Sequence, residues 1–470
     1  MKERPDTALL RGFSRFEWAL LVAFAAIVYF QLFVTPNIGL ANNGDYQKMI
    51  GRFWLGPMGW HNEDEQLFYE QRWRYDAAYH WVSDNYSSEL IWIGAAVGLS
   101  RLFSHEVFDL RVLGAIHALL WAGCFMTALP LFRGLRGWPR YVIPLLALCI
   151  FTDASYVVYL NSLHTDTSAF IFVCWSVVIA LRIAARPSNR WWPYSALLIA
   201  SLLFITAKPQ HSLLGLLWCV VVFALAPGSF GRGLALLAIP IAVVLTLISV
   251  PPAERQLEIS SSIFAKLLPR SADPENDLRA LGMPVEMKSW IGSYGDQALN
   301  NPLKNAQVLA VLTPAADRSL ALFYLEHPTR AFEIINSDLG WPAVHRRPPF
   351  LGNYQRKNGF ERRTLARSFH CWSDLRSEAF RLARWHVWVW YAAFMAIAAW
   401  RLGRTKSKAP LIALVLGAMG LLALASASLG EIGETDRHLW LFHVMTDLTL
   451  VIGAVWCGEH SRWVQARTLS

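Results

Sequence analysis

The sequence predicts an all-α polytopic membrane protein with about ten transmembrane helices, one re-entrant or interfacial segment and two long extracytoplasmic loops. Its 470 residues are 54% hydrophobic and only 16% charged, whereas a soluble chain of this length carries a larger charged share. Apolar segments long enough to cross a bilayer recur along the chain, and arginines cluster in alternate connections between them. The net charge of +9 therefore reflects membrane topology, and we expect no nucleic acid partner.

The first apolar segment, 17–35, follows Lys2, Arg4, Arg11 and Arg15, and no small-residue cleavage site comes after it. These features favour a retained first helix over a removed signal peptide, with the N-terminus in the cytoplasm. The further apolar spans are 112–131, 141–160, 167–183, 194–206, 211–226, 233–250, 386–401, 409–429 and 438–457.

The orientation of the later spans depends on the segment 90–103, which is apolar but short and is flanked by Glu89 and Arg101. If this segment does not cross, the arginine-rich short connections all face the cytoplasm, as the positive-inside rule requires; if it crosses, they face the opposite side. We therefore predict that 90–103 is re-entrant or lies in the interface. The basic residues placed inside by this topology are Arg133, Arg136, Arg140, Arg182, Arg186, Arg190, Arg232, Arg401, Arg404, Lys406, Lys408, Arg462 and Arg467.

Two long extracytoplasmic regions result, 36–111 and 251–385. They divide the chain into an N-terminal transmembrane module (1–250, which includes the first loop), the large loop (251–385) and C-terminal transmembrane helices (386–470). Loops of this size within a compact fold are usually functional.

The large loop is expected to contain an amphipathic helix around 319–335 and a basic, aromatic helix over 361–385 that lies along the outer face of the membrane. Five of the six cysteines fall within apolar spans, and only Cys371 lies outside them. This spacing indicates neither a disulfide framework nor a zinc site.

A short polar cluster, Asn42-Asn43-Gly44-Asp45-Tyr46, directly follows the first apolar segment. A carboxylate that has just left the bilayer, held by the turn chemistry of Asn and Gly, is well placed to act on a substrate at the membrane face. The alternative is that Asp45 only closes the end of the helix, since Asn-Gly-Asp is ordinary turn sequence.

Two further polar turns lie on the same predicted face. The turn between the spans 141–160 and 167–183 carries His164 and Asp166, although Thr165 or Asp166 could simply cap the next helix.

The other turn is Lys208-Pro209-Gln210-His211, in which Pro209 fixes the backbone and keeps the polar side chains together. Such a group suits a phosphate oxygen. A lysine at the bilayer edge can also extend to water without any further role.

A fourth element, 431–438, contains Glu434, Arg437 and His438 and leads into the last span. At helical spacing Asp436, Trp440, His443 and Asp447 share one face, which places Asp447 about 16 Å below Asp436. We interpret Asp447, and Asp153 within the third span, as members of buried ion pairs or hydrogen-bonded networks that fix helix packing.

Together these elements place carboxylates, a lysine and an arginine on one membrane face. This set suits transfer of a group from a lipid-linked phosphate. A carboxylate base would accept the proton of an acceptor hydroxyl, and the cations would stabilise the departing phosphate.

The pattern resembles the GT-C superfamily of integral-membrane glycosyltransferases, and within it the bacterial polytopic hexosyltransferases of surface-glycan and S-layer glycan assembly. The order and topology match over most of the chain, although each motif is short. The residues that carry the resemblance are Asn42-Asn43-Gly44-Asp45, Asn161-Ser162 with Asp166, Lys208-Pro209-Gln210 and Asp436-Arg437-His438.

The resemblance implies a hexosyltransferase of the bacterial cytoplasmic membrane whose active site faces away from the cytoplasm. Its donor would be a polyprenyl-phosphate sugar and its acceptor a glycan or a lipid-linked glycan, with membrane lipids around it. The catalytic residues would be Asp45, as the general base, and Asp166, which holds the place of the second-loop acid. The substrate-binding residues would be Asn43, His164, Lys208, Gln210, His211, Glu434, Arg437 and His438.

The second outer loop departs from the resemblance, because it reads His164-Thr165-Asp166 where many members have paired acids. A hard divalent cation prefers several carboxylate oxygens. We therefore expect no metal site and no cofactor.

Two other functions remain open. An O-antigen polymerase or ligase would use a diphosphate-linked donor and depend on His345, Arg346, Arg347 and His370 in the large loop, and replacement of Asp45 would then be mild. A lipid-glycan flippase or transporter would carry out no chemistry, and such folds often contain internal repeats, of which the sequence has none.

Overall fold

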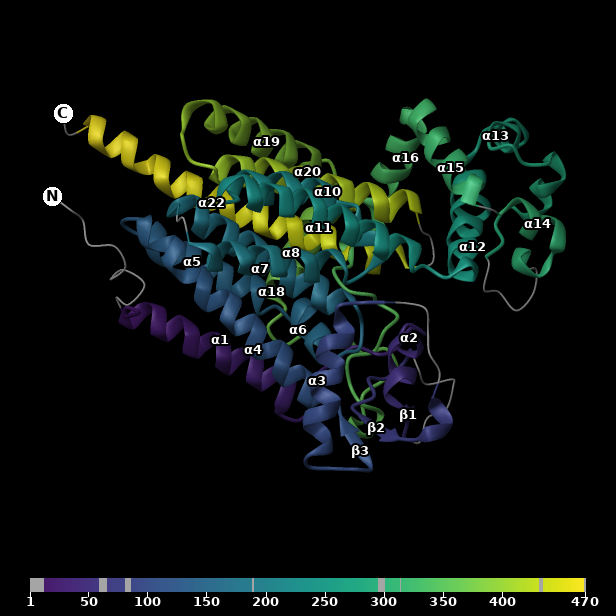
Figure 1. The fold of residues 1–470 in the computed structure, drawn as a ribbon, viewed down its shortest axis with the longest axis horizontal. Coiled ribbons are helices and arrows are strands. Elements are labelled where there is room, and N and C mark those ends of the chain that lie inside the picture. The colour runs from purple at the N-terminus through teal and green to yellow at the C-terminus, as the bar shows by residue number, and fades with distance from the viewer. Residues whose placement is uncertain are drawn as a thin grey trace.

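Helices dominate the computed structural model, and the long ones run side by side in one bundle (Figure 1). The start of α1 and the end of α22 lie at one end of this bundle, whereas the first loop and the helices in the first part of the large loop (252–338) lie at the other end. The first loop and this part of the large loop, both predicted to be extracytoplasmic, therefore share one end of the molecule. The structure describes residues 12–58, 66–80, 86–187, 190–294, 301–312, 314–430 and 434–468.

Six helices within these residues are long and apolar enough to cross a membrane, so the chain is a multi-pass membrane protein. They are α1 (Arg15–Phe33), α4 (Arg111–Ala128), α7 (Asp166–Ala185), α11 (Gly228–Ile248), α20 (Ala409–Gly430) and α22 (Trp440–Thr468).

The other predicted spans are helical too. They correspond to α5 (Pro139–Phe151) with α6 (Ala154–Leu160), to α8 (Trp191–Ile205), to α10 (Leu214–Leu225) and to α19 (His386–Arg404). With 15 and 12 residues, α8 and α10 are shorter than the roughly 20 residues that cross a bilayer. Ten crossings therefore remain a prediction.

The span predicted over 141–160 is a bent pair, because α5 and α6 meet at an angle of 53°. Asp153 has an extended backbone at this break, and its carboxylate accepts a hydrogen bond of 2.9 Å from the amide of Ser155. An aspartate in this conformation starts a new helix, so α6 begins at Ala154. The carboxylate also accepts hydrogen bonds from the amide and hydroxyl of Ser373, as a buried network residue should.

The first loop contains a small antiparallel sheet that the all-α prediction missed. Its order is β1 (Leu55–Pro57), β2 (Arg72–Tyr75), β3 (Val107–Asp109). Trp73 lies opposite Pro57 and Phe108, and its buried side chain alternates with the exposed Arg72 and Arg74. This alternation is the ordinary pattern of a strand with one buried face.

Two helices complete the first loop, α2 (Tyr46–Ile50) and α3 (Glu89–Arg101). Tyr46, Trp73 and Ile93 belong to a single buried cluster that joins both helices to the sheet. With 13 residues α3 is about 20 Å long, shorter than a bilayer core. That length agrees with a segment that does not cross.

The large loop begins with a separate helical unit that has its own core, which includes Phe264, Leu278, Val308 and Phe323. The single amphipathic helix predicted around 319–335 is two helices, because Pro328 stands at the first position of a new one. The helices of this unit are α12 (Pro252–Ser260), α13 (Pro274–Ala280), α14 (Ala306–Val311), α15 (Pro314–Glu326) and α16 (Pro328–Asp338).

The rest of the large loop returns to the bundle through α17 (Trp341–Val344) and α18 (Cys371–Ala383). The expected surface helix over 361–385 was wrong in two respects. Only the part from Cys371 to Ala383 is helical, and it buries Trp372, Arg376 and Phe380. The helix therefore packs one face against the rest of the protein and exposes the other.

Between α17 and α18 the chain pairs with the segment that follows α1. The amides of Gly39 and Ala41 donate to the carbonyls of Asn353 and Gly352. A side chain at position 352 would come within 2.0 Å of the carbonyl oxygen of Leu67, so this close approach requires glycine. The late part of the large loop is thus fixed against the first loop.

Candidate active site

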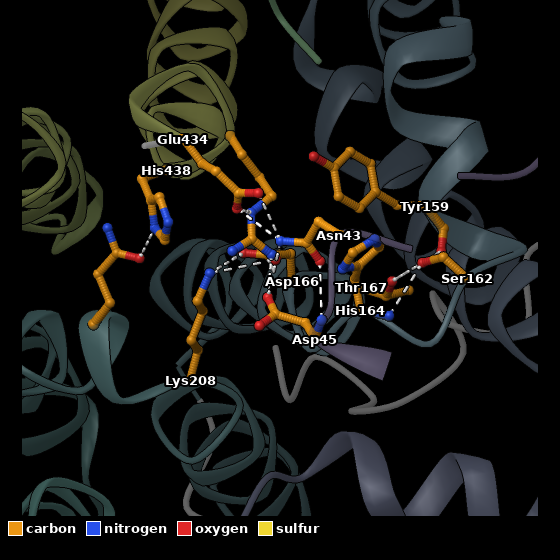
Figure 2. A network of polar contacts seen from close by, with 12 residues as sticks. Asn43, Asp45, Tyr159, Ser162, His164, Asp166, Thr167, Lys208, Glu434 and His438 are labelled. Carbon is orange, nitrogen blue, oxygen red and sulfur yellow. Dashed lines mark hydrogen bonds and ion pairs between the residues drawn. The ribbon is translucent and has the colours of Figure 1, made fainter. Parts of the chain in front are cut away.

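A cavity of about 790 Å³ lies where the first loop, the large loop and the polar turns of the bundle meet. Its walls come from the Asn42–Tyr46 cluster, from the Lys208 turn, from α12 and from the segment before α22. Figure 2 shows the polar contacts at its centre. Seven of the ten predicted site residues line it: Asn43, Asp45, Lys208, Gln210, Glu434, Arg437 and His438.

The turn before α2 aims Asp45 into this cavity. The side-chain oxygen of Asn42 accepts hydrogen bonds from the amides of Gly44 and Tyr46, at 2.9 and 3.0 Å. Gly44 has a φ of 104°, which a glycine adopts at little cost. Tyr46 is buried and donates through its hydroxyl to the carbonyl of Leu40. The turn is therefore held on both sides of Asp45.

Arg437 links the predicted acidic residues at one point. It lies in α21 (Thr435–His438) and is 4% exposed. Its guanidinium forms an ion pair with Asp45, lies 2.6 Å from Glu434 and lies 3.8 Å from Asp166. Glu434 also accepts hydrogen bonds of 2.7 and 2.9 Å from the amide of Asn43. The first and last polar elements, almost 400 residues apart, therefore form one network (Figure 2).

Lys208 joins this network through Asp166. Its backbone is extended, as expected for a residue before proline, and the turn continues into α9 (Pro209–Ser212). Its ammonium lies 3.3 Å from Asp166. Gln210 of the same turn accepts a hydrogen bond from His438. The prediction that Pro209 gathers these side chains is consistent with this geometry.

Three predicted site residues lie behind the cavity wall. Asp166, in the first turn of α7, is 2% exposed and contacts Lys208 and Arg437, so it is placed to position these cations. His164 is fully buried, with its ring against Tyr46 and its Nε2–H donated to the carbonyl of Ala41. His211 is also buried. These two histidines therefore support the walls of the cavity.

The sequence analysis missed Lys48, which lies one turn after Asp45 in α2. Its ammonium lies 3.0 Å from Asp45 and 2.6 Å from Glu254 of α12. A lysine three positions after an aspartate at a helix start was the available signal. Glu254 could not be foreseen, because its contact joins positions 206 residues apart. Other lining residues that the sequence analysis did not select are Tyr86, Arg255, Glu258, Ser261 and Tyr294.

The charges around Asp45 keep it ionised. Burial raises the pKa of its carboxyl group, but Arg437, Lys48 and Lys208 lower that pKa by more, to well below its ordinary value. Burial likewise lowers the pKa of Lys48, and the neighbouring Asp45 and Glu254 raise it by more. Asp45 is therefore a carboxylate among three cations at neutral pH, on a cavity wall that also carries Glu254, Glu258 and Glu434.

Replacing His164 with glutamine is expected to weaken the fall in stability between pH 6.5 and about pH 4. Burial and the nearby Arg437 lower the pKa of His164 to about 4, whereas an ordinary histidine titrates near 6.5. The unfolded chain then binds a proton in this window that the folded chain does not bind, so the free energy of unfolding decreases as the pH falls. Unfolding midpoints in detergent between pH 8 and pH 4 measure the effect.

Glutamine keeps a donor for the carbonyl of Ala41, so the two proteins should unfold alike above pH 7. Asp45 does not confound the comparison, because both proteins contain it and its stabilisation is lost only as the pH falls through and below the ordinary pKa of aspartate. The same pH dependence in both proteins would show that His164 does not titrate in this way.

One comparison with known proteins identifies a family. The family model described as the YfdI N-terminal transmembrane domain matches residues 8–469, almost the whole chain. The comparison with curated proteins found no match, and neither did the comparison with solved structures. A family defined by a transmembrane domain agrees with the six long apolar helices. The chain therefore belongs to the YfdI N-terminal transmembrane domain family.

Proposed function

We propose that this protein is a membrane glycosyltransferase. It moves a hexose from a polyprenyl-phosphate donor to a glycan or lipid-linked acceptor at the extracytoplasmic face of the cytoplasmic membrane, with Asp45 as general base. The observation that carries the proposal is the ionised Asp45 among Lys48, Lys208 and Arg437 on the wall of one cavity.

The three cations supply what a phosphate leaving group needs. Ammonium and guanidinium groups form strong, charge-assisted hydrogen bonds with phosphate oxygens, and they stabilise negative charge that develops as the sugar departs. Without substrate, Lys208 and Arg437 face the carboxylates of Asp166 and Asp45. A donor phosphate would therefore bind by competing with these carboxylates for the same cations.

This competition makes Asp45 more basic when the donor is bound. As Arg437 turns toward the phosphate, Asp45 loses part of the positive charge that lowers its pKa and becomes a better proton acceptor. An acceptor hydroxyl then gives its proton to Asp45 while its oxygen attacks the anomeric carbon. The bond from that carbon to the phosphate oxygen breaks, and polyprenyl phosphate leaves with the bonding electrons.

The cavity also offers an apolar wall for a lipid. Leu213, Leu247 and Val250, from the ends of α10 and α11, line it beside the polar residues. Leu213 is 43% exposed, so this wall continues onto the outer surface of the bundle. An apolar path of this kind favours a donor whose phosphate carries a long hydrocarbon chain.

Transfer from radiolabelled polyprenyl-phosphate hexoses in proteoliposomes tests the proposal. A hexose that leaves the donor only in the presence of the protein supports it. Full retention of label on every donor hexose, with and without candidate glycan acceptors, would count against it.

Adding EDTA is expected to leave the rate of transfer unchanged. Asp45 and Asp166 each already face cations, whereas a divalent metal needs several carboxylate oxygens. In the part of the chain that the structure describes, no group of three or more His, Cys, Asp or Glu side chains could hold an ion. Initial rates with and without chelator, each followed by added Mg²⁺ or Mn²⁺, check this; a loss that the metal restores would contradict it.

The polymerase or ligase alternative is less well supported. Of the residues on which it would depend, Arg346 is 3% exposed and forms an ion pair with Asp447, and Arg347 is equally buried and donates to the carbonyl of Ala366. Neither lines the cavity. A variant of Asp45 with nearly normal activity would nevertheless favour this alternative.

A further inference from the structure

Two cysteines that lie 222 positions apart bring their thiols together at the break between α5 and α6. The sulfur atoms of Cys149 and Cys371 are 3.2 Å apart. Cys149 stands two positions before the end of α5, and Cys371 is the first residue of α18. Cys371 is exposed and Cys149 is half-buried, whereas Cys124, Cys174 and Cys219 are buried. The chain thus contains one accessible pair of neighbouring thiols among its described cysteines.

Hydrogen bonds close to the two cysteines hold the two backbone segments together. The amide of Ala154 donates to the carbonyl of Phe369, at 3.1 Å. The amide and hydroxyl of Ser373 donate to the carboxylate of Asp153, at 2.9 and 2.6 Å. These contacts stand on both sides of Cys371 and four to five positions after Cys149. A bond between the sulfurs therefore needs only small movements of the side chains.

The pair lies beside the last turn of α1, which leads into the first loop. Gln31 stands two positions before the end of α1, and its amide donates to the carbonyl of Thr152, at 3.0 Å. The ring of Phe369 contacts that of Phe30 in the same turn of α1. With the first loop outside the cytoplasm, this end of the bundle faces a compartment in which disulfides form and persist.

We propose that Cys149 and Cys371 are oxidised to a disulfide that joins the late part of the large loop to the bundle. The oxidant is a protein disulfide of an extracytoplasmic thiol oxidoreductase. The thiolate of the exposed Cys371 attacks this disulfide, which forms a mixed disulfide and releases one thiol. The thiolate of Cys149 then attacks the sulfur of Cys371 and releases the second thiol. Two electrons and two protons pass to the oxidant.

The bond would close a loop that contains the polar turn with Asp166, the polar turn with Lys208 and the cavity-lining helix α12. It would fix the start of α18 to the end of α5. The sequence alone gave no reason to expect it, because Cys149 lies within an apolar span and Cys371 lies outside.

Counting free thiols tests the proposal on the full chain. Cells are treated with membrane-permeant N-ethylmaleimide before lysis, so that no bond forms during purification. The protein is then denatured and labelled with a maleimide of high mass, after reduction or without it. Six cysteines are present, so a disulfide leaves two that take the label only after reduction. Mass spectrometry of the unreduced protein should show the Cys149 and Cys371 peptides linked.

Three serine variants make the assignment specific. Cys149→Ser and Cys371→Ser should each leave no cysteine that requires reduction, whereas Cys457→Ser, an exposed cysteine on α22, should still leave two. A wild-type protein without thiols that require reduction, also after treatment of intact cells with diamide, would overturn the proposal. So would a linked peptide pair that joins other cysteines. The wild-type measurements stand even where a variant fails to fold.

Discussion

Replacing Asp45 with asparagine is expected to lower the rate of sugar transfer by at least about a hundredfold, the scale of a lost general base. Asparagine keeps the size of the side chain, and the turn before α2 is held by Asn42, so the cavity should keep its shape. The amide cannot accept the proton of an acceptor hydroxyl, and it leaves Arg437 and Lys48 without their shared anion. Initial rates in proteoliposomes, at matched amounts of folded protein, measure the effect.

Asp76→Asn is the matched control for this variant. Asp76 lies in the same loop, forms an ion pair of 2.8 Å with Arg74 and caps a short helical turn, but it does not line the cavity. Its replacement should leave transfer close to that of the wild type. If the Asp45 variant were as active as this control, Asp45 would be a turn residue and the polymerase, ligase and transporter functions would gain support.

The elements of the cavity that could be predicted are those whose chemistry is local. Asn42, Gly44 and Asp45 define a turn through neighbouring residues, and Pro209 fixes the backbone of Lys208 in the same way. The apolar segments between these turns are helical because each has the composition of a membrane span. These elements could be predicted because each depends on residues that are close together in the sequence.

The parts that could not be predicted depend on contacts between distant positions. Asp166 and Asp45 resemble one another in sequence, since each opens a helix after a polar turn. In the structure Asp45 faces the cavity, whereas Asp166 lies behind Lys208 and Arg437. The same limit applies to Lys48, whose second partner, Glu254, belongs to a loop with a separate core.

The predicted stripe from Asp436 to Asp447 shows a further limit of periodicity. Asp436 belongs to the short helix α21, and α22 begins only at Trp440, so the stripe is not one continuous helix face. The interpretation of Asp447 as a buried network residue nevertheless agrees with its contacts, because a carboxylate within an apolar span needs partners wherever it points.

Replacing Asp447 with asparagine is expected to destabilise the protein by about 3–5 kcal/mol, the cost of breaking a buried ion pair. Arg346 forms an ion pair with this carboxylate, and the guanidinium of Arg376 lies 3.6 Å from it. Tyr156 and Trp372 donate hydrogen bonds to it, at 2.6 and 3.0 Å. Asparagine would leave two buried guanidinium groups without their common anion. Unfolding in detergent, followed by tryptophan fluorescence, measures the loss.

Two further variants separate this effect from ordinary damage. Asp374→Asn changes an exposed aspartate of α18 that contacts only His370 among the described ion pairs, and we expect it to cost no more than about 0.5 kcal/mol. Adding Arg346→Gln to the Asp447 variant removes one of the unpaired buried cations and should recover part of the lost stability. If the double variant were less stable by the full sum of the single changes, Arg346 and Asp447 would not stabilise each other, and the late part of the large loop would be held to the bundle by its apolar contacts and by Asp153 instead.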